Sequence, residues 1–283
     1  MEETTNSSYF GSEARYRYFT ALKYLVYVLL SFNIYMFLQE ELSALEHTFV
    51  GPLEPGQIIQ AFSATIDTAA WVLLLLLFEL ETSVLDDSRI NGPVKWCLHG
   101  VRGLCYLAIG YAFFGYYAEL ITLYDVAPLM QQNLCALAGD GYSLAVDIDE
   151  YVPLDATNCV TLSAGAAQIN GFNILVSNDV LQAIRRLAWT DIFNSAAWIL
   201  VVIVLEVEVR LQLRGKLSSA IMDTTKYVKL LLYTTLFAAA GYWGYAGDFI
   251  DVWDASLWLF AFIFIELNVF EWQYETTHQP AAP

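Results

Sequence analysis

Six long apolar segments dominate this sequence and restrict what the chain can fold into. Each is close to the ~20 residues with which an α-helix crosses the hydrocarbon core of a bilayer. Only 15% of the residues are charged, against about 25% in an ordinary soluble domain. The sequence therefore predicts an all-α integral membrane protein, a single transmembrane domain over residues 1–283. The six predicted transmembrane helices cover roughly 18–38, 58–80, 97–122, 187–209, 226–247 and 254–272.

The basic residues lie almost entirely on one side of the predicted membrane. With the N-terminus inside the cell, 11 of the 13 Lys and Arg residues fall on or near the cytoplasmic side, and only Arg185 and Arg186 lie at an outer end. Cytoplasmic segments are enriched in Lys and Arg, so we expect both termini to be cytoplasmic. A cell membrane such as a bacterial inner membrane fits this pattern. The net charge of −17 disfavours nucleic acid and anionic substrates as partners, because both need a basic surface.

One predicted outer connection is long, at about residues 125–180, and it contains Cys135 and Cys159. An outward location is oxidising, which favours a disulfide between these two cysteines. A loop of this size is stabilised by roughly 3 kcal/mol when it is closed. The chain has four Cys without CxxC spacing and three His, so we expect no metal site and no cofactor.

Three of the apolar segments share a sequence motif. They read DTAAWVLLLLLFELE at 67–81, NSAAWILVVIVLEVE at 194–208 and DASLWLFAFIFIELN at 254–268. Without gaps, the motif aligns an Asx at its first position, a Trp at its fifth and a Glu at its thirteenth. These residues are Asp67, Asn194 and Asp254, then Trp71, Trp198 and Trp258, then Glu79, Glu206 and Glu266.

The motif falls in alternate helices, which predicts a threefold internal repeat of helical hairpins. The hairpins cover residues 16–85, 94–210 (with the loop 125–180) and 224–274. Parallel repeats of this kind pack around a pseudo-threefold axis along the membrane normal. We expect the repeated tryptophans to pack where the repeats meet rather than to bind a cofactor.

The repeated Glu residues lie in the inner half of their predicted helices, where an ionisable group costs roughly 2.5–3.5 kcal/mol and needs a partner or a role. Lys23, Arg102 and Lys229 fall at a similar depth and are candidate counter-charges. One interpretation is three structural ion pairs, one in each hairpin. A second is an acidic group near the axis that binds a cation or relays protons. A third is that the long side chains simply reach the interface.

The outer half of the predicted bundle carries a second acidic set. Its members are Asp67, Asn194 and Asp254, joined by Asp191 and Asp251, which both lie seven residues before the repeated Trp of their segment. They are candidates for an outer vestibule that concentrates cations. The alternatives are carboxylates at helix N-termini, which suit the helix dipole, and buried hydrogen-bonded groups.

Two functions are compatible with these patterns. The first is a channel or carrier for a cation or protons, which uses the repeated carboxylates. The second is a non-catalytic structural or accessory subunit of a larger membrane complex, formed as a homo-oligomer or with other membrane proteins. The 125–180 loop would then be its docking surface. No nucleophile or catalytic motif accompanies the carboxylates, so an enzyme is not expected.

Overall fold

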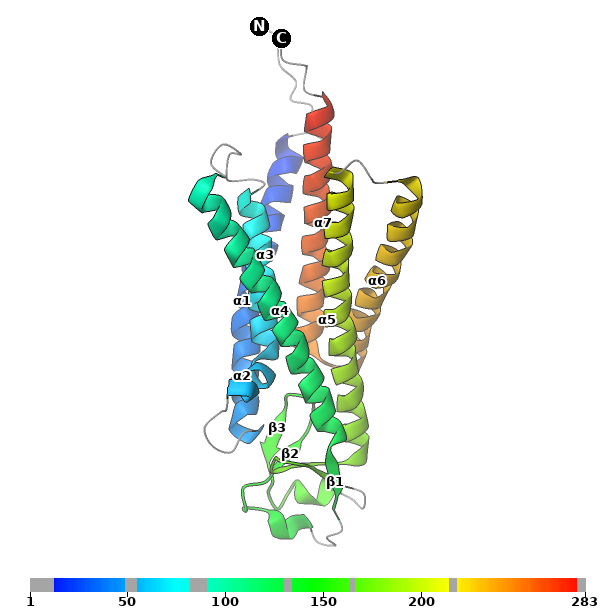
Figure 1. Cartoon of the computed structure of the whole chain (residues 1–283). Coiled ribbons are helices and arrows are strands. Elements are labelled where there is room, and N and C mark those ends of the chain that lie inside the picture. Colours follow the sequence, from blue (N-terminus) through cyan, green and yellow to red (C-terminus); the bar gives the residue numbers. More distant parts are fainter. Residues whose placement is uncertain are drawn as a thin grey trace.

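The computed structural model describes residues 13–48, 55–81, 91–129, 134–162, 166–213 and 218–278. Long helices lie side by side in one elongated bundle, and a small sheet covers one end of it (Figure 1). Each apolar segment of the sequence is helical. The helices are α1 (Glu13–Thr48), α2 (Pro55–Ala61), α3 (Ser63–Glu79), α4 (Gly92–Tyr124), α5 (Asn178–Leu213), α6 (Ser219–Ala246) and α7 (Phe249–His278).

Three of these helices are long and apolar enough to cross a membrane among the residues described: Ala14–Thr48, Gly92–Tyr124 and Asn178–Glu208. Large apolar side chains also point away from the bundle. Leu107 and Phe114 of α4 are 72% and 64% exposed, and Leu231 and Phe237 of α6 are 68% and 62% exposed. Such an outer surface suits contact with lipid rather than with water. The chain is accordingly treated as a membrane protein.

The segment 125–180, expected as a loop in an all-α protein, contains a five-stranded sheet. Its strands are β1 (Val126–Pro128), β2 (Ser143–Ala145), β3 (Tyr151–Pro153), β4 (Ala167–Ile169) and β5 (Ile174–Val176), in the order β1-β4-β5-β2-β3. All pairs are antiparallel except β2 with β5. Three residues are too few to reveal the two-residue alternation of a strand, so no sequence pattern indicated these strands.

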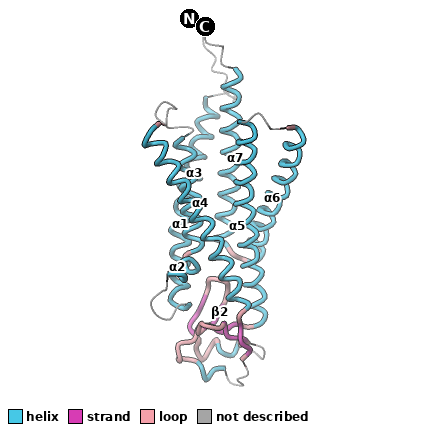
Figure 2. The backbone as a smooth tube through the Cα atoms, in the orientation of Figure 1, coloured by secondary structure: helices cyan, strands magenta, loops and turns pink. Residues whose placement is uncertain are grey.

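The predicted disulfide between Cys135 and Cys159 is confirmed. It joins the two short 3₁₀ turns Leu134–Leu137 and Cys159–Thr161, beneath the sheet. The sheet and the start of α1 lie at opposite ends of the bundle, and α7 ends beside the start of α1 (Figure 2). We call the half of the bundle next to the sheet the sheet half, and the half where α1 begins and α7 ends the terminal half.

The second apolar segment was expected to form one helix, but it is broken at Phe62 between α2 and α3. The break leaves backbone N–H groups without a partner in their own helix. Glu41 of α1 accepts two of them: Ala64 N–H at 2.7 Å, and Thr65 N–H at 3.3 Å. Gly115 of α4 passes so close that a Cβ there would lie 2.7 Å from the Ile59 carbonyl oxygen. The broken segment is therefore held from both sides.

The six long helices pack in chain order around a closed ring. Contacts run from α1 to α3, then through α4, α5 and α6 to α7, and α7 returns to α1. Trp71, Trp198 and Trp258 meet in the middle, with ring centroids 6.3, 6.3 and 6.4 Å apart. The helices that carry the repeated motif therefore approach one another through these three side chains.

Candidate functional site

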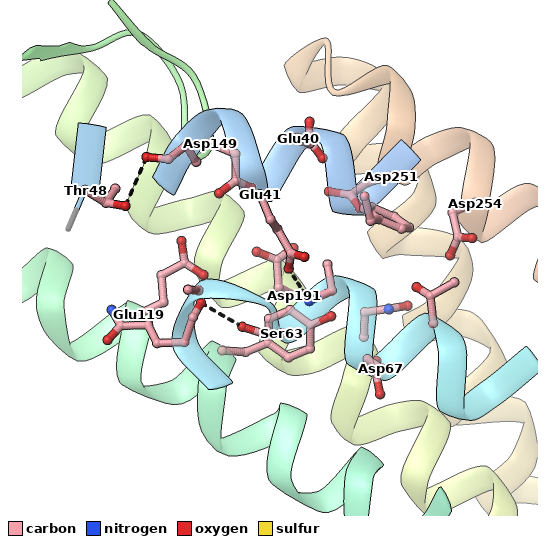
Figure 3. Close-up of a pocket in the computed structure, with 18 of the residues that line it drawn as sticks. Glu40, Glu41, Thr48, Ser63, Asp67, Glu119, Asp149, Asp191, Asp251 and Asp254 are labelled. Carbon is pink, nitrogen blue, oxygen red and sulfur yellow. Dashed lines mark hydrogen bonds between the residues drawn. The ribbon is translucent and has the colours of Figure 1, made fainter. Parts of the chain in front are cut away.

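A cavity of about 140 Å³ lies in the sheet half, enclosed by the helices and by part of the sheet region. This volume admits several water molecules. Among the described residues, eight carboxyl side chains line it and no Lys, Arg or His does. The eight are Glu40 and Glu41 of α1, Asp67 of α3, Glu119 of α4, Asp149 between β2 and β3, Asp191 of α5, and Asp251 and Asp254 of α7 (Figure 3).

Aromatic side chains form a second part of the lining. Trp71, Trp198 and Trp258 close the cavity toward the terminal half, since each lies one helical turn further along its helix than a polar residue of the lining. Their rings are tilted against one another by 54°, 60° and 68°. Phe262 packs on Trp198 with centroids 4.7 Å apart. The three tryptophans are thus packing residues, as expected, and they are also the floor of the cavity.

Some carboxylates in the cavity accept hydrogen bonds from neutral donors. Asn33 of α1 donates to Asp254 at 2.7 Å, and Trp243 of α6 donates its indole N–H to Asp191 at 3.1 Å. Asp67 differs, because its Oδ1 atom is buried and finds no donor among the residues described. The carboxyl groups thus share one space, and no Lys, Arg or His side chain lies beside them among the described lining residues.

Asp149 enters the cavity from the sheet region. The Val146 N–H donates to the Glu150 carbonyl oxygen at 2.9 Å, which closes the turn between β2 and β3 and carries Asp149 at its tip. Burial, together with the smaller effect of the nearby charges of Asp248 and Asp147, raises the pKa of Asp149 to about 7. Asp155, on the exposed side of the same region, behaves in the opposite way, because hydrogen bonds from Thr157 and Asn158 lower its pKa.

The terminal half holds its carboxylates in ion pairs. Lys23 of α1 contacts Glu79 of α3 at 2.6 Å, and each side chain is only 6% exposed. Tyr24 and Tyr27 donate their hydroxyl groups to the same carboxylate at 3.1 and 3.4 Å.

Two further ion pairs lie at the same level of the bundle. Arg102 of α4 contacts Glu81, two residues beyond the end of α3, at 2.5 Å, and Lys229 of α6 contacts Glu208 of α5 at 2.8 Å. Three interfaces between neighbouring helices are therefore tied by charge.

This pairing differs from the expectation of one ion pair in each hairpin. Arg102 and Lys229 use the Glu two residues after the repeated one, and both pairs join different predicted hairpins. Glu206 is exposed and pairs with Arg210 on its own helix at 2.7 Å. The reason is rotational: residues two apart point about 200° apart on a helix, so only one of each Glu pair faces the neighbouring basic side chain. The side chain of Glu266 lies outside the described residues.

The predicted outer set comes together as a group. Asp67, Asn194, Asp254, Asp191 and Asp251 all line the cavity, although they come from three helices. Sequence reasoning did not select Glu41 and Glu119 as part of this set, since their helices lack the repeated motif. The only available signal was an acidic residue within or beside an apolar segment.

Comparison with known proteins gives no match: no family model, no curated protein and no solved structure is similar to this chain.

Proposed function

We propose that this protein transports a cation or protons across a membrane and takes its substrate up through the acidic cavity. The observation that carries the proposal is the cavity lining, in which eight carboxyl groups face one space and none of the described lining residues is basic. Buried like charges are costly, and they are found in membrane proteins mainly along ion and proton pathways. A bound cation removes the repulsion between them.

We further propose that the chain spans the membrane six times, as three hairpins around a pseudo-threefold axis, with both termini in the cytoplasm. The meeting of Trp71, Trp198 and Trp258 supports the axis, because each comes from the same position of the repeated motif. The distribution of basic residues supports the orientation. Arg15, Arg17, Lys23, Lys95, Arg102, Lys226 and Lys229 all lie in the terminal half of the described chain.

In this arrangement the cavity faces outward and is closed on the cytoplasmic side. The three tryptophans form one barrier, and the ion pairs of Lys23, Arg102 and Lys229 form a second one below it. Transport requires both to open, which favours a gated channel or a carrier of the alternating-access type over a permanently open pore. The broken segment α2–α3 resembles the discontinuous helices that form substrate and ion sites in many transporters.

Ion flux into sealed liposomes tests the proposal. The purified protein is reconstituted, and uptake of Na⁺, K⁺, H⁺ and Ca²⁺ is followed under an imposed voltage. We expect flux of at least one cation, strongly reduced in Asp67→Asn and in Asp254→Asn. The matched control is Asp223→Asn, which removes one exposed carboxylate of α6 outside the cavity.

Liposomes that stay tight to every cation would contradict transport. They would favour the alternative, a structural or accessory subunit of a larger membrane complex, in which the sheet region is the docking surface. Co-purification of a partner that is lost on removal of the sheet region would then identify that role.

A further inference from the structure

The aromatic floor of the cavity leads to a more specific substrate. Cations bind over the faces of Trp and Tyr within about 6 Å of the ring centroid, and organic ammonium ions are the ligands that proteins recognise in this way. The three floor tryptophans have centroids 6.3–6.4 Å apart, so one cation resting on the floor is within reach of all three. Trp243, Tyr116 and Tyr151 add further aromatic surface to the walls.

The carboxylates of the cavity are spread along it rather than gathered at one point. Among the described residues, no three Asp, Glu, His or Cys side chains are close enough together to hold one metal ion. A Ca²⁺ site needs six to eight oxygen ligands around one centre. Dispersed carboxylates suit a ligand with positive charges at several places along its length.

One carboxylate oxygen in the cavity lining is an unused hydrogen-bond acceptor for such a ligand. Oδ1 of Asp67 is buried without a hydrogen-bond donor among the described residues, one turn from the floor residue Trp71. A buried acceptor of this kind is costly unless it is paired. An ammonium N–H supplies both the missing donor and the missing positive charge.

Resting on the function proposed above, we propose that the cavity binds a linear polyamine. One ammonium group lies on the tryptophan floor and donates to Asp67 and Asp254. A second lies nearer the sheet, where Glu119 and Asp149 face the cavity from opposite sides (Figure 3). The aliphatic chain between them passes Tyr116 and Tyr151.

Calorimetric titration of the purified full-length protein with spermidine tests this proposal. We expect saturable binding that Mg²⁺ at the same concentration does not displace. Asp67→Asn and Trp258→Leu are each expected to weaken binding by about tenfold or more, the size of a lost charged hydrogen bond or cation–π contact. Trp258→Phe keeps an aromatic ring at the floor of the cavity and should therefore lose less spermidine affinity than Trp258→Leu does. This comparison separates a loss of recognition from misfolding. Asp223→Asn should bind as the unmodified protein does.

Three results would overturn the proposal: no saturable binding, displacement by Mg²⁺ at equal concentration, or equal weakening in Asp223→Asn and Asp67→Asn. Its failure is distinguishable from that of the transport proposal. Flux of an inorganic cation without spermidine binding would support the transport proposal and contradict the polyamine proposal. Spermidine binding by a protein whose liposomes stay tight to every cation would support the binding site and contradict transport.

Discussion

The two halves of the bundle treat buried acidic side chains in opposite ways. In the terminal half, Glu79, Glu81 and Glu208 each contact a Lys or Arg of a neighbouring helix. In the sheet half, eight carboxyl groups share one cavity, and no basic residue lines it in the part of the chain that the structure describes. The same helices, α3 and α5, contribute to both halves, so the difference is a matter of position along each helix.

This contrast separates stability from function. A buried carboxylate with a cation beside it is balanced within the protein, and its removal leaves the partner charge uncompensated. A carboxylate with no cation beside it contributes little to the stability of the fold. Its presence therefore indicates a role in binding a ligand that supplies the positive charge. Neutralising substitutions should therefore have opposite effects on stability in the two halves.

The largest effect is expected for Lys23→Met. The change leaves the buried Glu79 carboxylate with only two tyrosine hydroxyls, so the protein should lose about 3–5 kcal/mol of unfolding free energy. Unfolding in mixed micelles, followed by circular dichroism, measures the loss. The double variant Lys23→Met with Glu79→Leu should recover much of it. A single variant as stable as the unmodified protein would contradict the structural role of this pair.

The disulfide is expected to contribute nearly as much. Cys135 and Cys159 are 24 residues apart, and closing a loop of that size stabilises by about 3 kcal/mol. The variant Cys135→Ser with Cys159→Ser should unfold at lower temperature, with the sheet region opening first. Hydrogen exchange of residues 134–162 measures this directly. Protection that does not change on removal of the bond would show that the sheet region needs no covalent support.

Asp67→Asn should change stability in the opposite direction from Lys23→Met. It removes one of several like charges from the cavity and replaces an unpartnered oxygen with an amide that can donate to a neighbouring carboxylate. We expect a gain of about 1 kcal/mol. The unfolding temperatures of Asp67→Asn and Glu79→Gln are compared with that of the unmodified protein, and Glu79→Gln should be the less stable variant. A loss in both variants would mean that the two halves do not differ.

Asp149 should make the stability of the protein depend on pH. Burial raises its pKa from 3.8 to about 7, so the folded protein holds the proton more tightly than the unfolded chain does. Its contribution is complete below pH 3.8 and is lost as pH rises through about 7. Asp149→Asn should therefore melt a few degrees above the unmodified protein at pH 8 and lose that advantage at pH 4. The control is the neighbouring variant Glu150→Gln, which removes an exposed carboxylate from the same turn.

The smallest effect is expected for Glu206→Gln. Its partner Arg210 is four residues away on the same helix, and both side chains are at least half exposed. Pairs of this kind contribute about 0.3–0.5 kcal/mol. Chemical unfolding should barely distinguish the variant from the unmodified protein. A loss approaching that of Lys23→Met would mean that Glu206 has a partner other than Arg210.

The helices and the disulfide were predictable because their signals are long or specific. Apolar segments of about 20 residues leave few alternatives to a helix, and Cys135 and Cys159 are the two cysteines of a single predicted loop. The sheet was not predictable, since each strand has three residues. The break at Phe62 also carries no Pro or Gly. It depends on Glu41, which lies on another helix, and on close contact with Gly115.

The candidate site was predictable in part. The repeated motif identified Asp67, Asn194 and Asp254, because identical positions in repeats point toward the same axis. Asp149 could not be predicted as part of the site, because the turn between β2 and β3 is what brings it to the cavity. The pairing of Lys23, Arg102 and Lys229 with Glu residues was predicted, but Arg102 and Lys229 contact other Glu residues than expected. Helix rotation decides which of two Glu residues faces the neighbour, and apolar segments without a polar face leave that rotation undetermined.

The most direct test of this account measures flux and unfolding temperature in two matched sets of variants. The first set neutralises the cavity with Asp67→Asn, Asp191→Asn and Asp254→Asn, each made singly. The second neutralises the ion pairs with Glu79→Gln, Glu81→Gln and Glu208→Gln. Neutralising the cavity carboxyl groups is predicted to remove cation flux while the unfolding temperature stays the same or rises, whereas neutralising the ion pairs is predicted to lower the unfolding temperature. Cavity variants that conduct as the unmodified protein does, or two sets that behave alike, would contradict it.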